Sequence, residues 1–342
     1  MRAYRLDRFG LEHLRLAEID PPQPGPGEIV LEVRAVSLNY RDLLVIKGQY
    51  NPKFRLPATP LSDGAGVVAA VGAGVERVRV GDRVVSHFIS GWIDGPFRAE
   101  YVATTLGLPK AGLAAEQVAL PAEAVLPLPA GYDFAAAATL PIAALTAWSV
   151  LVSEGRVEAG QTVLTLGTGG VSLFALQFAK ALGARVIITS GSAEKLARAV
   201  NIGVGAPALR ADHGINYRTD PEWHQQVLRL TDGQGADVTV ETGGAGTLNQ
   251  SLKATRAGGL IGMLGALTGL QGEIDLSLVL RKRLRIAGIF VDSRAAFERM
   301  NRFIEEHGLR PVIDRVYPFD QLPEALRLME AGGHFGKIVV TR

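Results

Sequence analysis

Residues 163–190, VLTLGTGGVSLFALQFAKALGARVIITS, contain an apolar run, a glycine-rich turn, an amphipathic stretch and a second apolar run. Val163–Leu166 is apolar and β-rich enough to form a buried parallel strand, which ends at the turn 167–170. Apolar residues then recur at the spacing of one helix face, and Gly183 marks the helix end before a second strand at 184–189. This order predicts a strand, helix and strand of a parallel sheet.

The glycine turn gives this unit a chemical role. A glycine turn at a helix N-terminus lets backbone N–H groups and the helix dipole meet a pyrophosphate, and larger side chains would hold the phosphates away. A plain glycine turn in an α/β sheet is the alternative, but the surrounding elements follow in the required order. Ser172 stands at the third glycine position of the fingerprint and is small enough for close packing. We expect a bound dinucleotide, with pyrophosphate contacts from Gly167, Thr168, Gly169, Gly170 and Val171.

The residues after the second strand distinguish NADP from NAD. NAD binders carry an acidic residue about 20 positions beyond the glycines, which binds the ribose 2′-hydroxyl. Here Ser190, Ser192 and Lys195 occupy that region, without a carboxylate at the strand end. Hydroxyls and a cation suit a 2′-phosphate, so we expect NADP, with NAD still possible. Alternatively, Glu194 and Lys195 are only exposed residues on the first turn of the next helix.

Length and composition limit the class of protein. The chain has 342 residues, 47% hydrophobic and 20% charged, which allows two domains with cores of their own. The net charge of +2 comes from interspersed residues without a basic block, so nucleic-acid binding has little support. No run approaches the roughly 20 apolar residues of a membrane span, and the N-terminus lacks a signal-peptide core, so we expect a cytoplasmic protein.

The pattern of elements divides the chain. Residues 2–125 contain short strand patterns separated by Pro and Gly, at 29–36, 65–71, 83–85 and 100–104. An alanine-rich helical region at 135–152 leads into the 163–190 unit, and further strands follow at 214–217, 238–241, 260–264 and 284–289. These predict a doubly wound parallel sheet over 126–295. A helix at 295–307, a strand, a short helix and a last strand at 337–340 form a tail that we expect to return to the N-terminal domain.

The chain resembles the medium-chain dehydrogenase/reductase superfamily over nearly its whole length, in particular its zinc-independent, quinone oxidoreductase-like branch and its zinc-type alcohol dehydrogenase-like members. The resemblance rests on several motifs: Asn39-Tyr40-Arg41-Asp42, Gly48-Gln49-Tyr50, Ser62-Asp63-Gly64-Ala65-Gly66, Gly81-Asp82-Arg83-Val84, Leu145-Thr146-Ala147-Trp148, the glycine turn, Gly214-Ile215-Asn216-Tyr217-Arg218 and His334-Phe335-Gly336-Lys337. It implies an α/β protein with a GroES-like distorted β-barrel catalytic domain (1–125 and 296–342) and a Rossmann domain (126–295). It also implies an active site in the cleft and a homodimer, which edge pairing near 284–289 would allow.

The same resemblance predicts that zinc is absent. Zinc-dependent alcohol dehydrogenases of this superfamily hold the catalytic metal with cysteine, histidine and a further cysteine or acidic residue, and these positions are Asn39, Ser62 and Ile142 here. Ser62 and Ile142 cannot replace such ligands, and Asn39 is a poor one. The chain has no cysteine for a structural zinc lobe or a disulfide, and its six histidines show no paired spacing.

Without a metal, the reaction would need hydrogen-bond donors instead. Quinones and α,β-unsaturated carbonyls spread the charge of an added hydride onto an oxygen, which donors can stabilise. The candidate catalytic residues are Asn39, Asp42, Tyr50 and Thr146. Asp42 either orients a donor and relays a proton or only caps the turn after Asn39. His87 is a further candidate proton donor, although a lone histidine is more often structural.

More residues are assigned to the cofactor by resemblance and by position. Tyr217 is a candidate on the adenosine side, or a strand-end aromatic residue that packs on the sheet. Residues that end strands on the ligand edge of the sheet are expected to line the nicotinamide path: Gly243, Leu264, Gly265, Phe290 and Val291. Lys337 matches a family residue near the cleft, but a single lysine in an exposed tail is weak evidence.

These observations predict a zinc-independent NADP(H) oxidoreductase that transfers hydride to a quinone or an α,β-unsaturated carbonyl. One alternative is a metal-free alcohol dehydrogenase or ketone reductase acting on a small secondary alcohol. Another is a nucleotide-binding protein without redox turnover, although the polar cluster from Asn39 to Tyr50 has little reason to exist in a pure binding module.

Overall fold

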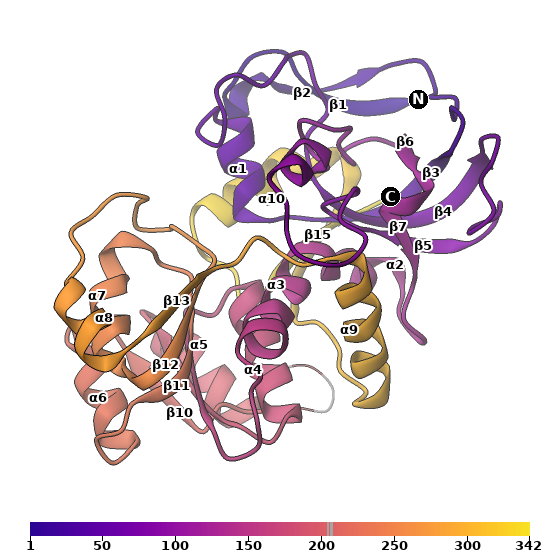
Figure 1. Ribbon diagram of the computed structural model, residues 1–342. Helices are drawn as coiled ribbons and strands as arrows, with labels where there is room; N and C mark the ends of the chain where they lie inside the picture. The colour runs from indigo at the N-terminus through magenta and orange to yellow at the C-terminus, as the bar shows by residue number, and fades with distance from the viewer. Residues whose placement is uncertain (204, 206–207) are drawn as a thin grey trace. The chain divides into compact units, whose positions relative to one another are not determined.

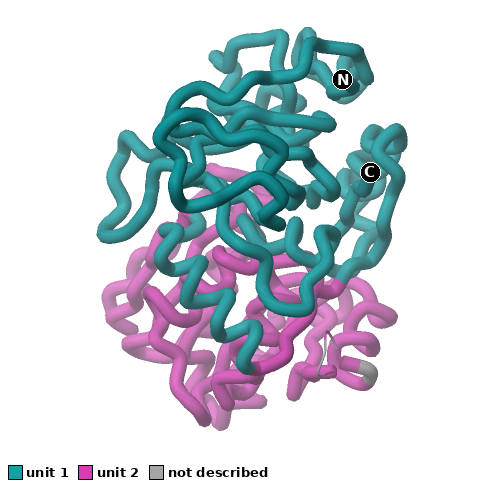
Figure 2. The backbone as a smooth tube through the Cα atoms, turned by 90° about the vertical axis from the view of Figure 1, so that its right-hand side faces the viewer, with its two compact units in different colours: residues 1–143, 291–306, 313–342 teal, residues 144–290, 307–312 magenta. Residues whose placement is uncertain are grey.

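The computed structural model describes residues 1–203, 205 and 208–342. The chain forms two compact units, coloured separately in Figure 2: unit 1 comprises Met1–Ala143, Val291–Glu306 and Ile313–Arg342, and unit 2 comprises Ala144–Phe290 and His307–Val312. Residues 126–143 and 291–295, which the sequence patterns assign to the nucleotide-binding domain, therefore belong to unit 1. The reason is packing, because helix α2 (Phe134–Ala138) contacts strands β3 (Glu28–Ser37) and β4 (Asp63–Val71) of unit 1.

Unit 2 is built on a six-stranded parallel sheet in the order β10-β9-β8-β11-β12-β13. The strands are β8 (Thr162–Leu166), β9 (Arg185–Ser190), β10 (His213–Asn216), β11 (Ala236–Glu241), β12 (Thr255–Met263) and β13 (Arg285–Gly288). The chain winds outward from β8 in both directions, which puts the topological switch point between β8 and β11, where such sheets bind ligands. The predicted doubly wound sheet is confirmed.

Helices surround this sheet (Figure 1). They are α3 (Leu145–Trp148), α4 (Gly170–Ala181), α5 (Ala193–Ala197), α6 (Trp223–Leu230), α7 (Ala245–Ala254) and α8 (Leu276–Lys282), and α3 continues as a wider helical turn, Ser149–Glu154. Every residue of β8 is buried, as are Phe174 and Phe178 on α4, so the apolar face predicted for this helix does pack inward. The α4 helix ends at Ala181 with Leu182 as its C-cap, and Gly183 follows the helix as predicted.

Unit 1 contains a seven-stranded sheet in the order β14-β15-β3-β4-β5-β7, with β6 also paired to β3. Its other strands are β5 (Arg83–Ser86), β6 (Gln117–Pro121), β7 (Val125–Pro127), β14 (Ile313–Pro318) and β15 (Lys337–Thr341), and β1 (Arg2–Leu6) pairs with β2 (Leu14–Glu18) in a separate ribbon. The C-terminal β15 runs antiparallel to β3, with Val340 opposite Val36. Both ends of the chain therefore build this unit, as expected (Figure 1).

The helices of unit 1 are α1 (Tyr40–Ile46), α2, α9 (Arg294–Glu306) and α10 (Leu322–Glu330). The prediction of a strand at 100–104 is wrong, because Ala99–Thr104 forms a 3₁₀ helix. There the Thr104 hydroxyl donates to the Tyr101 carbonyl at 2.7 Å, which closes a local turn, and Tyr101 stacks on Trp92. Among the described residues, no helix is long and apolar enough to span a bilayer.

Candidate functional site

The glycine turn after β8 leaves its backbone accessible. Gly167 has φ +79°, a conformation that residues with a Cβ rarely adopt. A Cβ built on Gly167 or on Gly169 would meet no atom within 4 Å, so the side of the turn that lacks side chains is open. Because Gly169 is the N-cap of α4, the cap residue itself places no side chain at the first N–H groups of this helix. These features fit the pyrophosphate of a dinucleotide.

The residues around this turn hold it in place. Ser172, at the third fingerprint position, donates from its hydroxyl to the Leu166 carbonyl at 2.6 Å, and the Gly167 N–H donates to the Thr189 hydroxyl at 3.3 Å. Thr168 is buried, whereas Gly170 and Val171 are half-buried at the start of α4. Ser172 thus stands where the fingerprint has its third glycine, and its hydroxyl links the helix start to the preceding strand.

The end of β9 carries the residues predicted for a 2′-phosphate. The Ser192 N–H donates to the Ser190 hydroxyl at 3.2 Å, and the Ser192 hydroxyl accepts the Lys195 N–H at 3.3 Å. Ser192 is therefore the N-cap of α5, and Glu194 is an exposed residue of the first turn. These contacts agree with the alternative that the segment is the exposed first turn of the next helix. Binding of a 2′-phosphate by these residues stays a prediction.

A cation that the sequence patterns did not single out lies at the same strand end. A Cβ built on Gly191 would come within 2.9 Å of Arg218 Nε and of the Tyr217 ring, so both side chains lie directly against the Gly191 backbone. Tyr217 is 44% exposed, which leaves part of its ring available to a ligand. The pairing of β10 with β9 brings Arg218 to this place, and sequence spacing alone does not reveal that pairing.

A buried carboxylate at the end of β11 binds the turn that follows this strand. Glu241, fully buried at the end of β11, accepts the N–H groups of Gly243 at 2.7 Å and Gly244 at 3.1 Å through Oε1. Its two oxygens also accept the hydroxyls of Thr247, at 2.6 Å, and Ser251. The turn that contains Gly243 is thus fixed by four donors, none of them a cationic group.

The other residues predicted for the nicotinamide path end neighbouring strands. The Leu264 N–H donates to the Glu241 carbonyl at 3.1 Å, and a Cβ on Gly265 would come within 2.4 Å of the Thr242 carbonyl oxygen. Gly243, Leu264 and Gly265 are therefore gathered at the ends of β11 and β12. Phe290 is the last residue of the long segment of unit 2, and Val291, with φ +58°, opens the next segment of unit 1.

The predicted catalytic residues divide between the units. Thr146 is buried on α3 in unit 2, whereas Asn39, Asp42 and Tyr50 belong to unit 1. Tyr50 is 37% exposed, and the Arg41 guanidinium lies 4.7 Å from its ring centre and 4.9 Å from that of Phe88. Arg41 also donates to the carbonyls of Gly107 and Leu108, so it is anchored by protein groups.

Asp42 caps the helix that Asn39 begins. The Asn39 N–H donates to Asp42 Oδ2 at 2.8 Å, as in a capping box. Burial raises the pKa of Asp42 to about 7, against the lowering effect of Arg41 and of this N–H group. Among the described residues, Asp42 Oδ1 is buried without a hydrogen-bond partner. Asp42 therefore caps α1, which is one of the two roles predicted for it. Its Oδ1 atom remains an acceptor without a partner among the described residues.

The three metal-ligand positions of the zinc enzymes do not offer a metal site here. The Ser62 hydroxyl donates to Asp63 Oδ1 at 3.1 Å, and Ile142 contributes only its N–H, which donates to Asp63 Oδ2 at 3.0 Å. Asn39 Oδ1 accepts the Lys337 ammonium at 2.7 Å, and that fixed positive charge would repel a metal cation. Within residues 1–203, 205 and 208–342, no group of three His, Cys, Asp or Glu side chains could hold a metal. These residues do not fit a catalytic zinc.

Lys337 is not the exposed tail residue that its position in the sequence indicates. Its side chain is buried, 4% exposed, and its ammonium donates to the Leu38 carbonyl as well as to Asn39. The pairing of β15 with β3 carries it into the interior of unit 1. Burial lowers the pKa of Lys337 to about 8, although Asp63 and Asp42 oppose that effect.

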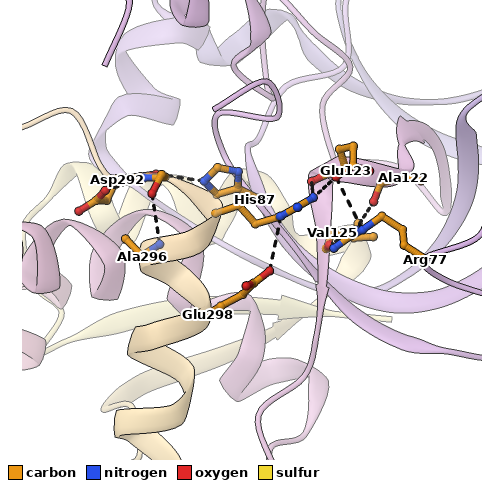
Figure 3. Close-up of polar contacts among 10 residues, drawn as sticks. Arg77, His87, Ala122, Glu123, Val125, Asp292, Ala296 and Glu298 are labelled. Atoms are coloured by element: carbon orange, nitrogen blue, oxygen red, sulfur yellow. Dashed lines mark hydrogen bonds and ion pairs between the residues drawn. The ribbon is translucent and has the colours of Figure 1, made fainter. Parts of the chain in front are cut away.

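His87 has a structural environment. It is fully buried, and its Nε2 lies 3.1 Å from the Asp292 carbonyl oxygen, to which it can only donate (Figure 3). Burial lowers its pKa to about 4, so the ring is neutral near pH 7. The same view labels Arg77 and Glu123, which form an ion pair. Glu123 also pairs with Arg294, the first residue of α9. His87 therefore helps to anchor the segment before α9, as the structural alternative expected.

Comparison with known proteins matches each part of the chain to a family model. The model described as alcohol dehydrogenase GroES-like domain matches residues 25–130, and the one described as zinc-binding dehydrogenase matches residues 170–306. A zinc-type alcohol dehydrogenase-like protein of Schizosaccharomyces pombe is 40% identical over 97% of this chain and 96% of its own length. The chain belongs to the medium-chain dehydrogenase/reductase superfamily. A quinone oxidoreductase of Pongo abelii is 30% identical to this dehydrogenase/reductase over 99% of the chain and 97% of the relative.

Solved structures agree with this membership. An NAD-dependent alcohol dehydrogenase matches with a TM-score of 0.89 and 38% identity, covering 100% of both chains. A mycobacterial protein complexed with NADPH matches with a TM-score of 0.84 and 27% identity, also covering 100% of both chains. This member of the medium-chain dehydrogenase/reductase superfamily is an NAD(P)-dependent oxidoreductase with a GroES-like domain and a Rossmann sheet.

Proposed function

We propose that this oxidoreductase is zinc-independent and transfers hydride from NADPH to a quinone or an α,β-unsaturated carbonyl. The observation that carries the proposal is the chemistry at Asn39, Ser62 and Ile142, where an amide bound to an ammonium, a hydroxyl and a backbone N–H replace metal ligands. A conjugated acceptor needs only hydrogen-bond donors at its oxygen, because the charge of the added hydride spreads onto that oxygen. A relative named quinone oxidoreductase supports this acceptor class.

The nicotinamide cofactor would supply the hydride, and the residues of this chain would bind and orient both partners. The N–H groups from Gly167 to Val171 would bind the pyrophosphate at the start of α4. Gly243, Leu264, Gly265, Phe290 and Val291 would line the nicotinamide. Asn39, Tyr50 and Thr146 would donate hydrogen bonds to the acceptor, and Asp42 would hold the Asn39 backbone in place.

NADP is the preferred cofactor in this proposal, and its 2′-phosphate would bind at the end of β9. Ser190, Ser192 and Lys195 belong to that proposed subsite, and Tyr217 and Arg218 extend it, because both pack on Gly191. A phosphate binds a guanidinium more strongly than a diol does, because the contact is charge-assisted. NAD is the competing cofactor, since the 38% identical solved relative is an NAD-dependent alcohol dehydrogenase.

The test is a set of acceptors assayed with NADPH and with NADH. We expect NADPH oxidation with a quinone or an enone, no turnover of simple ketones and unchanged rates after treatment with a strong chelator. Metal analysis of the purified protein should find no stoichiometric zinc. Turnover confined to ketones or secondary alcohols, or activity that a chelator removes and zinc restores, would overturn the proposal.

A metal-free alcohol dehydrogenase or ketone reductase is the second candidate. It is favoured by the names of the 40% identical relative and of the 38% identical solved structure, both of which refer to alcohol dehydrogenases. Oxidation of a small secondary alcohol by the chelated enzyme, without quinone reduction, would select this candidate.

We also propose a homodimer formed through the outer edge of the unit 2 sheet. Strand β13 is an edge strand, so its backbone can pair with a second copy. The neighbouring residues include large apolar side chains that are unusually exposed, among them Leu270 at 87%, Leu276 at 65% and Leu280 at 76%. Sedimentation of the purified protein tests the dimer, and a monomer at all concentrations would contradict it.

A further inference from the structure

A carboxylate and an ammonium connect four separate segments in the interior of unit 1. Asp63 is the first residue of β4, and Lys337 is the first residue of β15. Asn39 precedes α1, and Ile142 lies on a helical turn, Leu140–Ala144. These segments are far apart in the chain, so their contacts exist only in the folded unit.

Asp63 binds two of the three metal-ligand positions. Its Oδ1 accepts the Ser62 hydroxyl at 3.1 Å, and its Oδ2 accepts the Ile142 N–H at 3.0 Å. The carboxylate is fully buried, and burial raises its pKa, although the nearby Lys337, the Asn39 amide and these two donors oppose that rise. Asp63 thus fixes Ser62 and Ile142 relative to each other.

Lys337 binds Asn39, the third of the metal-ligand positions. Its ammonium donates to Asn39 Oδ1 at 2.7 Å and to the Leu38 carbonyl, so the amide oxygen of Asn39 is committed to a cation. The amide nitrogen must then lie on the other side of the group. Asn39 Nδ2 is buried on the side of Asp63, and its N–H group there lowers the pKa of that carboxyl. Lys337 at the oxygen and Asp63 on the nitrogen side therefore fix the orientation of the Asn39 amide.

Charged groups this deeply buried are expensive. Taking a carboxylate and an ammonium out of water costs several kcal/mol each unless hydrogen bonds and opposite charges compensate. Because a hydrophobic pair of similar volume is often at least as stable, stability alone does not account for this charged pair.

We propose that Asp63 and Lys337 are positioning residues that take over the cross-linking task of a metal, and that together they fix the orientation of the Asn39 amide, the donor proposed for the acceptor oxygen. Asp63 holds Ser62 and Ile142, and Lys337 holds Asn39 and Leu38. The proposal rests on the proposed reduction of a conjugated acceptor. It adds the residues that keep the donor in place for that reaction.

The test compares Lys337→Met with Lys282→Met, a matched control. Lys282, in unit 2, is also partly buried, and its ammonium donates to the carbonyls of Leu252, Lys253 and Thr255. Both variants lose a lysine that binds backbone carbonyls, so both should lower the Tm. Only K337M should lower kcat, by about 100-fold, because small errors in the position of a reacting group have effects of that size.

Further readouts separate positioning from stability. The K337M variant should bind NADPH with a Kd within about twofold of the wild type, measured by fluorescence titration, because the loss falls on kcat. Lys337→Arg keeps a cation that can donate to Asn39 Oδ1, so K337R should keep more of the rate than K337M. Asn39→Asp keeps an oxygen for Lys337 but removes the amide donor, so N39D should fold and lose kcat as K337M does.

Several results would overturn the proposal. If K337M and K282M lose Tm alike and both keep the wild-type kcat, Lys337 is structural only. If K337M does not fold, N39D and K337R carry the test, and an N39D variant with the wild-type kcat is decisive against it. Failure of the proposed function is distinct, because it shows as wild-type enzyme that reduces no quinone or enone; the same variants are then compared on the acceptor that is turned over.

Discussion

The two units of this dehydrogenase/reductase bury polar groups in different ways. In unit 2, the buried carboxylate of Glu241 is satisfied by two N–H groups and two hydroxyls. In unit 1, the buried Asp63 has a hydroxyl and an N–H partner and also lies in the field of the Lys337 ammonium. The first arrangement fixes a turn, and the second brings titratable groups together. The buried carboxylate of unit 1 is therefore sensitive to a neighbouring charge, whereas that of unit 2 fixes backbone geometry.

The largest effect on stability is expected from removing the Glu241 carboxylate of unit 2. Glu241→Gln places an NH₂ group among four donors, which leaves some of them buried and unpaired. The free energy of unfolding should fall by about 3 kcal/mol. Urea unfolding measures this loss, and Thr165→Val, at a buried hydroxyl of the same sheet, is a matched control that should cost much less. An E241Q variant as stable as the wild type would show that the turn does not depend on this carboxylate.

Unit 1 should show the stronger pH dependence, and His87 provides a test. Its pKa falls from 6.5 to about 4 on folding, so the unfolded state binds a proton that the folded state rejects. The stability contributed by this group is complete above pH 6.5 and is lost as the pH falls toward 4, with about 2 kcal/mol lost by pH 5. His87→Gln should therefore lose less stability than the wild type over that interval, measured by urea midpoints. Parallel pH profiles for the two proteins would contradict this.

At the end of β9, where we propose that the 2′-phosphate binds, the charged side chains should affect cofactor binding. Arg218→Ala and Lys195→Ala should each weaken NADPH binding by about tenfold and leave NADH binding nearly unchanged, because only NADPH carries the 2′-phosphate. Fluorescence titration with both cofactors measures the ratio. Arg229→Ala, an arginine on α6, is the control. Equal losses for the two cofactors would mean that these cations do not contact the 2′-phosphate.

The smallest effect on catalysis is expected at the outer edge of unit 2. Leu280→Glu places a charge on an apolar side chain that is 76% exposed, so it should oppose association and change kcat by less than about twofold. Sedimentation velocity gives the association state. Glu158→Lys provides a control, because Glu158 is an exposed charge outside that apolar region. An L280E variant that sediments as the wild type does would remove this residue from the proposed dimer contact.

The sequence predicted those parts of the fold whose signals are local. The βαβ unit follows from a buried apolar run, a turn of glycines and a helical repeat, all within 163–190, and the structure places each where expected. The parallel sheet around β8 also followed from alternating strand and helix patterns. The strand predicted at 100–104 was wrong because Thr104 closes a local turn, and alternation of apolar residues does not register that hydrogen bond.

The candidate site was less predictable because its contacts join distant residues. The position of Lys337 in a tail indicates an exposed side chain, yet its hydrogen bond to Asn39 spans 298 residues of sequence. Asp63 reaches Ile142 across 79 residues. Arg218 lies against Gly191 only because β10 pairs with β9. The contacts of Lys337 and Arg218 depend on strand pairing, and that of Asp63 depends on a helical turn packing against a strand end. The hydrophobic pattern of one element does not identify its neighbour.

The pairing of β15 with β3 has a consequence for how the protein is made. A ribosome has synthesised residues 144–290, most of unit 2, before it reaches β14 and β15. All six strands of the unit 2 sheet are therefore available before the sheet of unit 1 receives its last strand. Lys337 arrives with that strand, so the buried charge cluster is assembled only at the end of translation. A nascent chain halted before residue 337 would carry a nucleotide-binding sheet without the ammonium that fixes Asn39.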